Sequence, residues 1–240
     1  MMIKKLPRNR AGRDWVVGDL HGCFELLRRL MKTIGFNPQT DRLISVGDLV
    51  DRGPDSHLVG EWLAQPWFHA VRGNHEQMAL DAMRNPLEDL DRHLRNGGRW
   101  LSEMPPAERD ACVAALAQLP LAIEIDSEVG KIGVVHADCP GNDWSALAER
   151  LAANCPSAED YDALLWSRER VFDRGAGHVN GVALLLVGHT PQDHAVRYDN
   201  VMHLDTGAVY GGKLTLFCLD DFVEVSLPAG AEHAARFQLH

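Results

Sequence analysis

The 240-residue sequence has no long apolar run and no signal-like leader. Its longest apolar run, residues 181–188, has the length of a strand and falls far short of the roughly 18 residues that a membrane helix needs. The N-terminus is basic but carries neither a long apolar segment nor a cleavage site of small residues, so we expect no signal peptide. These absences disfavour a membrane-spanning or secreted protein, and we predict a cytoplasmic one.

Paired cysteines and an excess of positive charge are also missing. The five cysteines are scattered and form no C-x-x-C pair, which excludes a zinc ribbon or a disulfide scaffold and indicates reduced thiols. Lys and Arg total 24 against 34 Asp and Glu, so the formal net charge is −10. Because nucleic acids and anionic membranes attract positive surfaces, we expect neither as a partner. The oligomeric state cannot be read from the sequence.

The chain carries no linker or charge block that would divide it. We therefore predict a single catalytic domain over residues 1–227 and a C-terminal tail over 228–240. The first half alternates strand patterns, at 14–18, 42–46 and 68–71, with helix patterns, which is typical of parallel strands joined by helices. Residues 86–119 are helical in pattern and are expected to form an insertion over the sheet. The later strands are expected to form an antiparallel meander, at about 182–187, 200–205, 213–219 and 222–226.

Polar side chains follow the predicted strands, each in a short turn. Five turns of this kind hold Asp, His, Asn or Arg: GDLHG (18–22), GDLVDRGP (47–54), RGNHE (72–76), VVHAD (134–138) and VGHTP (187–191). Taken singly, each is explained by a helix cap, a turn or a hydrogen-bonded histidine. Ligand sites in α/β folds lie at the carboxyl ends of strands, so the five together predict a converging set of oxygen and imidazole ligands. Such a set suits two hard or borderline divalent metals.

The order and spacing of GDLHG, GDLVDRGPDS and RGNHE resemble the signature set of the PPP family of metal-dependent serine/threonine protein phosphatases. Within that family the chain is most similar to the small bacterial and phage-lambda-like enzymes. The later segments LLWSRER (164–170) and LDTGAVYGGKLTL (204–216) are similar too, so the resemblance covers residues 14–219. It implies the metallophosphoesterase fold, an α/β β-sandwich flanked by helices in four layers, α/β/β/α.

The resemblance also implies a site for two divalent metal ions. Mn²⁺ is the expected metal, and the ligand set admits Fe, Zn or Ni as well. Asp48 would bridge the two ions, and a hydroxide shared by them would attack phosphorus in line. The implied metal ligands are Asp19, His21, Asp48, Asn74, His136 and His189.

A second implied unit protonates the leaving group. His75 would be the general acid, and Asp51 would hold its other ring nitrogen. The alternative is that His75 only supports its neighbour Asn74.

Arginines bind phosphate oxygens through two parallel donors. The resemblance assigns this role to Arg52, Arg72 and Arg168, with Arg170 as a competitor of Arg168.

Other polar residues have no assigned role. His203 follows an apolar strand start and looks as ligand-like as His189, but the family pattern places the ligand in Gly-His-Thr-Pro, so we expect a structural role for His203. His93 is grouped with the surface or structural histidines. The segment NGGRW (96–100) is interpreted as a turn between helices, with Trp100 packing beneath it.

The predicted function is hydrolysis of phosphoserine and phosphothreonine monoesters in proteins, with phosphotyrosine also admitted. A bis(5'-nucleosyl)-tetraphosphatase of the same fold is the alternative, because it shares the fold, the metals and several motifs. A third reading is a non-catalytic scaffold that binds phosphorylated partners. Loss of a ligand or of the acid would favour a scaffold, but every implied position is filled here.

Overall fold

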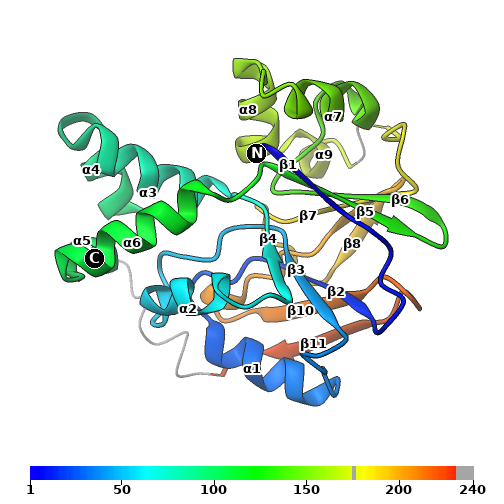
Figure 1. The fold of residues 1–240 in the computed structure, drawn as a ribbon, viewed down its shortest axis with the longest axis horizontal. Coiled ribbons are helices and arrows are strands. Elements are labelled where there is room, and N and C mark those ends of the chain that lie inside the picture. The colour runs from blue at the N-terminus through cyan, green and yellow to red at the C-terminus, as the bar shows by residue number, and fades with distance from the viewer. Residues whose placement is uncertain (175–176, 231–240) are drawn as a thin grey trace.

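Two β-sheets lie face to face, with helices on both outer faces (Figure 1). The computed structural model describes residues 1–174 and 177–230. The core between the sheets is built from β-branched and leucine side chains, such as Ile44 of one sheet and Val134 and Leu186 of the other. One further hydrophobic core lies between each sheet and the helices that cover it. The four-layer α/β/β/α architecture is therefore confirmed.

The first sheet has the strand order β11-β10-β2-β3-β4. Strands β2, β3 and β4 are parallel, whereas β10 is antiparallel to β2 and β11 to β10. Its strands are β2 (Asp14–Val17), β3 (Arg42–Ser45), β4 (Phe68–Ala70), β10 (Lys213–Cys218) and β11 (Glu224–Pro228). The parallel strands are joined by α1 (Phe24–Thr33), η1 (Ser56–Leu58) and α2 (Val59–Leu63). Strands β2 and β3 are short and almost wholly buried, which explains why their apolar residues follow one another without alternation.

The second sheet has the order β1-β5-β6-β7-β9-β8. Strands β6, β7 and β9 run parallel to one another, and β5 and β8 are antiparallel to their inner neighbours β6 and β9. Its strands are β1 (Ile3–Leu6), β5 (Ala122–Ser127), β6 (Gly130–Val135), β7 (Leu184–Val187), β8 (Val196–Tyr198) and β9 (Val201–His203).

Four helices project together from one end of the sheets as an arm (Figure 1). They are α3 (Asn74–Arg84), α4 (Pro86–Arg95), α5 (Arg99–Glu103) and α6 (Pro106–Ala117). The helical insertion predicted over 86–119 is confirmed as α4 to α6, but it projects from one end of the sheets, whereas the prediction placed it over the sheet. The remaining helices are η2 (Pro140–Asn142), α7 (Trp144–Ala152), α8 (Ala158–Trp166), α9 (Glu169–Phe172) and η3 (Ala208–Tyr210). Within the described residues, no helix has both the length and the apolarity to cross a membrane.

The predicted meander is wrong in its connections. Strand β9 joins the second sheet parallel to β7, and the chain then crosses to the first sheet, where β10 pairs with β2. Among the four predicted strands, all of which lie in the described part of the chain, β10 and β11 form the expected antiparallel hairpin, while β9 pairs antiparallel with β8, a strand that was not predicted. The predicted tail begins inside β11, which ends at Pro228, and its residues 231–240 lie outside the described part of the chain. The domain boundary at 227 stays a prediction.

Candidate metal centre and acid dyad

The carboxyl ends of strands from both sheets meet at one edge of the sandwich. Asp19, Asp48 and Asn74 follow the parallel strands β2, β3 and β4, and His136 and His189 follow β6 and β7 of the second sheet. All five are buried. The backbone N–H of His189 donates to the carboxylate of Asp19, with N···O distances of 3.2 and 3.1 Å, which joins the two sheets at this point.

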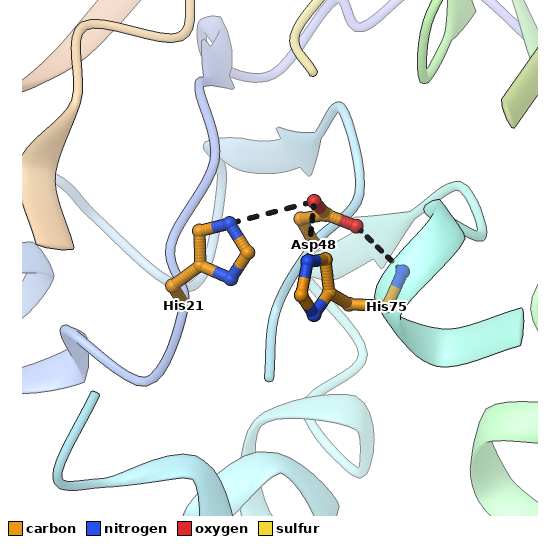
Figure 2. A group of neighbouring side chains, drawn as sticks. All are labelled: His21, Asp48 and His75. Carbon is orange, nitrogen blue, oxygen red and sulfur yellow. Dashed lines mark hydrogen bonds and ion pairs between the residues drawn. The ribbon is translucent and has the colours of Figure 1, made fainter. Parts of the chain in front are cut away.

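Asp48 lies at the centre of the cluster. Its Oδ2 is 3.4 Å from His21 Nε2 and 3.9 Å from His75 Nε2, as Figure 2 shows, and its Oδ1 is 3.4 Å from His136 Nε2. Two buried groups of possible ligands therefore share this carboxylate: His21, Asp48 and His75 form one, and Asp48, His136 and His189 form the other, with their ligand atoms within 4.8 Å of one another. This arrangement is that of a binuclear metal site.

The imidazole rings are oriented by backbone carbonyl oxygens. His21 Nδ1 lies 2.9 Å from the carbonyl of Val50, and His136 Nδ1 lies 2.9 Å from that of Val46. His136 Nε2 then faces Asn74 Oδ1 at 2.8 Å. A ring nitrogen that donates to a carbonyl leaves the other nitrogen unprotonated and available to a metal, which is the usual support of a histidine ligand. The ring orientations thus fit bound cations.

The charge balance of the cluster also fits bound cations. Burial, and then the charges of Asp205 and Asp48, raise the pKa of Asp19 well above its ordinary value. Burial raises the pKa of Asp205 to about 7 and lowers that of His21 and His189 to about 3, so these imidazoles are neutral. Carboxylates crowded in a buried site beside neutral imidazoles are suited to binding divalent ions.

Left-handed backbone conformations are concentrated in this region. Asp48, Asp51, Arg52 and His189 have φ angles of 49°, 70°, 70° and 68°, and His21 has 42°. Non-glycine residues in this region cost on the order of 1 kcal/mol each and persist where the surroundings fix them, often at functional sites.

Glu76 fixes the turn that carries Asp48. Its Oε2 accepts the N–H groups of Gly73 (2.8 Å) and Asp48 (2.9 Å), and its Oε1 accepts that of Leu49 (2.8 Å). The N–H of Val50 also donates to Oε1 at 3.3 Å. A buried carboxylate thus ties the start of α3 to the turn after β3, and this explains the final residue of the RGNHE motif.

His75 and Asp51 form a buried pair beside Asp48. His75 Nδ1 lies 2.7 Å from Asp51 Oδ2. The backbone N–H of His75 donates to Asp48 Oδ1 at 3.0 Å, and Figure 2 marks this bond with a dashed line. Asp51 also accepts hydrogen bonds from the side chains of His93 and Trp100, which lie on the helical arm. The grouping of His93 with unassigned histidines therefore missed a residue that lies beside the site.

The four arginines of the sequence prediction lie in different surroundings. Arg52 Nη1 is 2.7 Å from His21 Nε2, and Arg168 Nε is 3.3 Å from His189 Nε2, so both lie at the cluster. Arg72 instead donates to Gln77 and to the carbonyls of Ala117 and Leu119 near the end of α6.

Arg170 is buried and committed to other partners. It bonds to the carboxylate of Asp138 and to Asn142 and the carbonyl of Gly177. Its guanidinium is thus held away from the cluster, and Arg168 is the one of the two competitors that reaches a predicted ligand.

His203 lies outside both groups of possible ligands. It is buried in β9 with its ring 5.5 Å from that of Tyr198, and neither of its ring nitrogens has a hydrogen-bond partner within the described residues. Burial lowers the pKa of His203 to about 4.

Comparison with known proteins agrees with this geometry. The sequence profile of the family described as calcineurin-like phosphoesterase matches residues 13–201. The chain belongs to this family. It is 40% identical to serine/threonine-protein phosphatase 1 of Salmonella typhimurium strain LT2, over 84% of this chain and 89% of that protein. It is 35% identical to serine/threonine-protein phosphatase 2 of Escherichia coli K12, over 89% of this chain and 96% of that protein.

A solved structure of a candidate diadenosine tetraphosphatase superposes with a TM-score of 0.69 at 25% identity, covering 95% of this chain and 98% of that one. The predicted membership of the bacterial metal-dependent phosphatases and the predicted enzyme class, a metallophosphoesterase, are confirmed. Sequence reasoning missed Glu76, His93, Trp100 and Asp205 as parts of the site. Glu76 and Asp205 stand inside the quoted motifs, so their position was a usable signal, whereas His93 carried none.

Proposed function

We propose that this enzyme is a serine/threonine protein phosphatase. The observation that carries the proposal is the 40% identity, over most of both chains, to a protein named for that activity. The two buried groups that share Asp48 support it, because they bring together four of the six implied ligands, His21, Asp48, His136 and His189. The other two, Asp19 and Asn74, are hydrogen-bonded to His189 and lie beside it.

Two divalent metal ions, with Mn²⁺ as the expected pair, are part of the proposal. Asp19, His21 and Asp48 would hold one ion, and Asp48 with the residues Asn74, His136 and His189 would hold the other. The neutral imidazoles and the crowded carboxylates support this assignment. When bound, two such ions would polarise the phosphate and acidify water, which makes hydroxide available near neutral pH.

The chain's own residues would bind the phosphate and move the proton. Arg52, which lies beside His21, and Arg168, which lies beside His189, would bind phosphate oxygens. Arg72 would have to break its three hydrogen bonds, to Gln77 and to the carbonyls of Ala117 and Leu119, before it could bind phosphate. We therefore assign it the structural role of holding these groups. His75, whose Nε2 faces the side of Asp48, would protonate the departing alkoxide, and Asp51 would hold Nδ1.

The test compares two substrates in the presence of Mn²⁺. We expect turnover of a phosphoserine peptide, and far slower turnover of diadenosine tetraphosphate. Preference for the dinucleotide would replace the proposal with the tetraphosphatase, whose fold the chain shares. The Asp48→Asn variant is the control, because loss of the shared carboxylate should abolish both activities while the fold, followed by circular dichroism, persists.

A further inference from the structure

The carboxylate of Asp51 is fully buried and accepts three hydrogen bonds. His75 Nδ1 lies 2.7 Å from Oδ2, His93 Nε2 lies 3.0 Å from Oδ1, and Trp100 Nε1 donates to the same Oδ1 at 2.7 Å. His93 is on α4 and Trp100 on α5, so two of the three donors come from the helical arm. The arm therefore reaches the acid dyad from outside the two sheets.

These donors decide the state of Asp51. Burial alone would raise the pKa of this carboxyl, but the hydrogen bonds from His75 and His93 outweigh burial and lower the pKa to about 2. Asp51 is thus an anion whose Oδ1 is occupied by the arm. The oxygen that remains for His75 is Oδ2. Because a carboxylate oxygen can only accept a hydrogen bond, His75 Nδ1 must carry a proton. His75 Nε2 is then the nitrogen on the side of Asp48, 3.9 Å from its Oδ2.

The turn between α4 and α5 also packs against the backbone of Asp51 and Arg52. The N–H of Arg52 donates to the carbonyl of Gly97 at 3.4 Å. A Cβ on Gly97 would lie 2.5 Å from the Arg52 nitrogen, and one on Gly98 would lie 2.2 Å from His93 Nε2, so both positions demand glycine. This close packing supports the two consecutive left-handed residues, Asp51 and Arg52. The NGGRW segment is thus a support for the acid dyad and is more than a turn.

We propose that His93 and Trp100 are positioning residues, which hold the Asp51 carboxylate so that it keeps one proton on His75 Nδ1 and directs His75 Nε2, which carries the second proton of the imidazolium when the ring acts as the acid. The inference rests on the proposed function, in which His75 is the general acid. Removal of either donor leaves Asp51 Oδ1 with one of its two hydrogen bonds from the arm, so the carboxylate is held less firmly against the His75 ring. The step that becomes slower is then the transfer of a proton from His75 to the leaving group.

The test uses Trp100→Phe and His93→Gln, with Arg95→Gln on the exposed side of α4 as the matched control. Each Mn²⁺-loaded variant is assayed with phenyl phosphate, whose leaving group needs a proton, and with p-nitrophenyl phosphate, whose leaving group does not. We expect kcat for phenyl phosphate to fall about 10-fold in the two test variants, and kcat for p-nitrophenyl phosphate to change less than about twofold. Arg95→Gln should match the wild type on both substrates.

A double-variant cycle separates positioning from general support. In the His75→Asn background, Trp100→Phe should cause no further loss with phenyl phosphate, because the group it acts through is gone. Equal losses on the two substrates, no loss on either, or a full additional loss in the His75→Asn background would each overturn the proposal.

A measurement on metal-free protein makes the inference independent of turnover. Two-bond ¹H–¹⁵N spectra, recorded at a pH where the ring is neutral, report the tautomer of each histidine ring, and the His75 signals are identified by their absence in His75→Asn. We expect the Nδ1–H form in the wild type and a mixture in Trp100→Phe. An Nε2–H form in the wild type would overturn the proposal even if neither test variant folds. Failure of wild-type protein to hydrolyse any phosphomonoester would reject the proposed function, while the tautomer would still test the positioning.

Discussion

At the scale of the residue, the contacts of His75 support the proposed acid role over the role of a strut, the two roles that sequence alone left open. A strut for Asn74 would need only a bulky, buried side chain, whereas His75 has one ring nitrogen on Asp51 and the other toward Asp48. A paired, directed ring of this kind is what proton transfer to a leaving group requires.

The first prediction tests this role of His75. The His75→Asn variant should lower kcat for a phosphoserine peptide by about 100-fold or more, because asparagine cannot deliver a proton to the alkoxide. The loss with p-nitrophenyl phosphate should be much smaller. Steady-state kinetics on both substrates and the metal content of the purified variant provide the measurement. Parallel losses on the two substrates with unchanged metal content would favour the strut.

A second prediction concerns Asp205, whose buried carboxyl has its pKa raised to about 7. Between the ordinary pKa of Asp and 7, the folded chain holds a proton here that the unfolded chain has lost, so the metal-free protein loses stability as the pH rises through this window. The Asp205→Asn variant should not show this pH-dependent loss of stability, because an asparagine side chain does not titrate. Its melting temperature without metal should therefore exceed that of the wild type by an amount that grows from pH 5 to pH 8, reaching about 3 °C or more.

The control for this measurement is Asp110→Asn, an exposed residue on α6. Its melting temperature should follow that of the wild type at every pH. A difference between Asp205→Asn and the wild type that stays constant from pH 5 to pH 8 would contradict the assigned pKa.

At the scale of the element, the contacts of Glu76 join α3 to the turn after β3. Four backbone N–H groups point at one carboxylate, so a third prediction is that Glu76→Gln, which replaces one acceptor oxygen by a donor, lowers the free energy of unfolding by about 3 kcal/mol. Activity should fall too, because the turn carries Asp48. Urea denaturation measures the first effect. Glu149→Gln on the exposed side of α7 should cost little, and an equal loss there would show that the charge alone matters.

The elements also show where sequence reasoning succeeds. Strands β2, β3 and β4 were predicted from apolar runs, and because parallel strands end at a common edge, the residues that follow them had to meet. The connections of β9 and β10 were not predictable in this way, since an apolar strand carries no mark of the sheet it will join. The edge strands β1 and β8 and the single-turn helix α9 were missed because charged residues interrupt these short segments, as in Ile-Lys-Lys-Leu and Val-Arg-Tyr, so they show no apolar run.

The contacts between the helical arm and Asp51 could not be predicted from the sequence for a different reason. His93 and Trp100 meet Asp51 across 42 and 49 residues of sequence. Their meeting depends on how α4 and α5 fold back, and helical periodicity fixes only which residues share a helix face. The Arg168 and Arg170 alternatives likewise needed the structure, because their sequence spacing does not reveal that Asp138 holds one of them.

At the scale of the whole molecule, the carboxylates of the cluster imply that metal and stability are linked. The fourth prediction is that chelation abolishes hydrolysis of p-nitrophenyl phosphate and lowers the melting temperature by about 5–10 °C, as expected for loss of a ligand present at about 100 times its dissociation constant. Scanning calorimetry and activity, before and after chelation, provide the measurement. Added Mn²⁺ should restore both, and undiminished activity in the chelator would contradict the metal site.

The bond from the backbone of His189 to Asp19 joins residues 170 positions apart, one from each sheet. Neither sheet alone holds enough ligands for two ions, so the centre cannot form until both sheets have docked. Bound cations would then link the two sheets to each other and would bind late in folding, after the sheets have docked. Amide hydrogen exchange should consequently slow at the ends of β2, β3, β6 and β7 together when metal is added, in both halves of the chain at once.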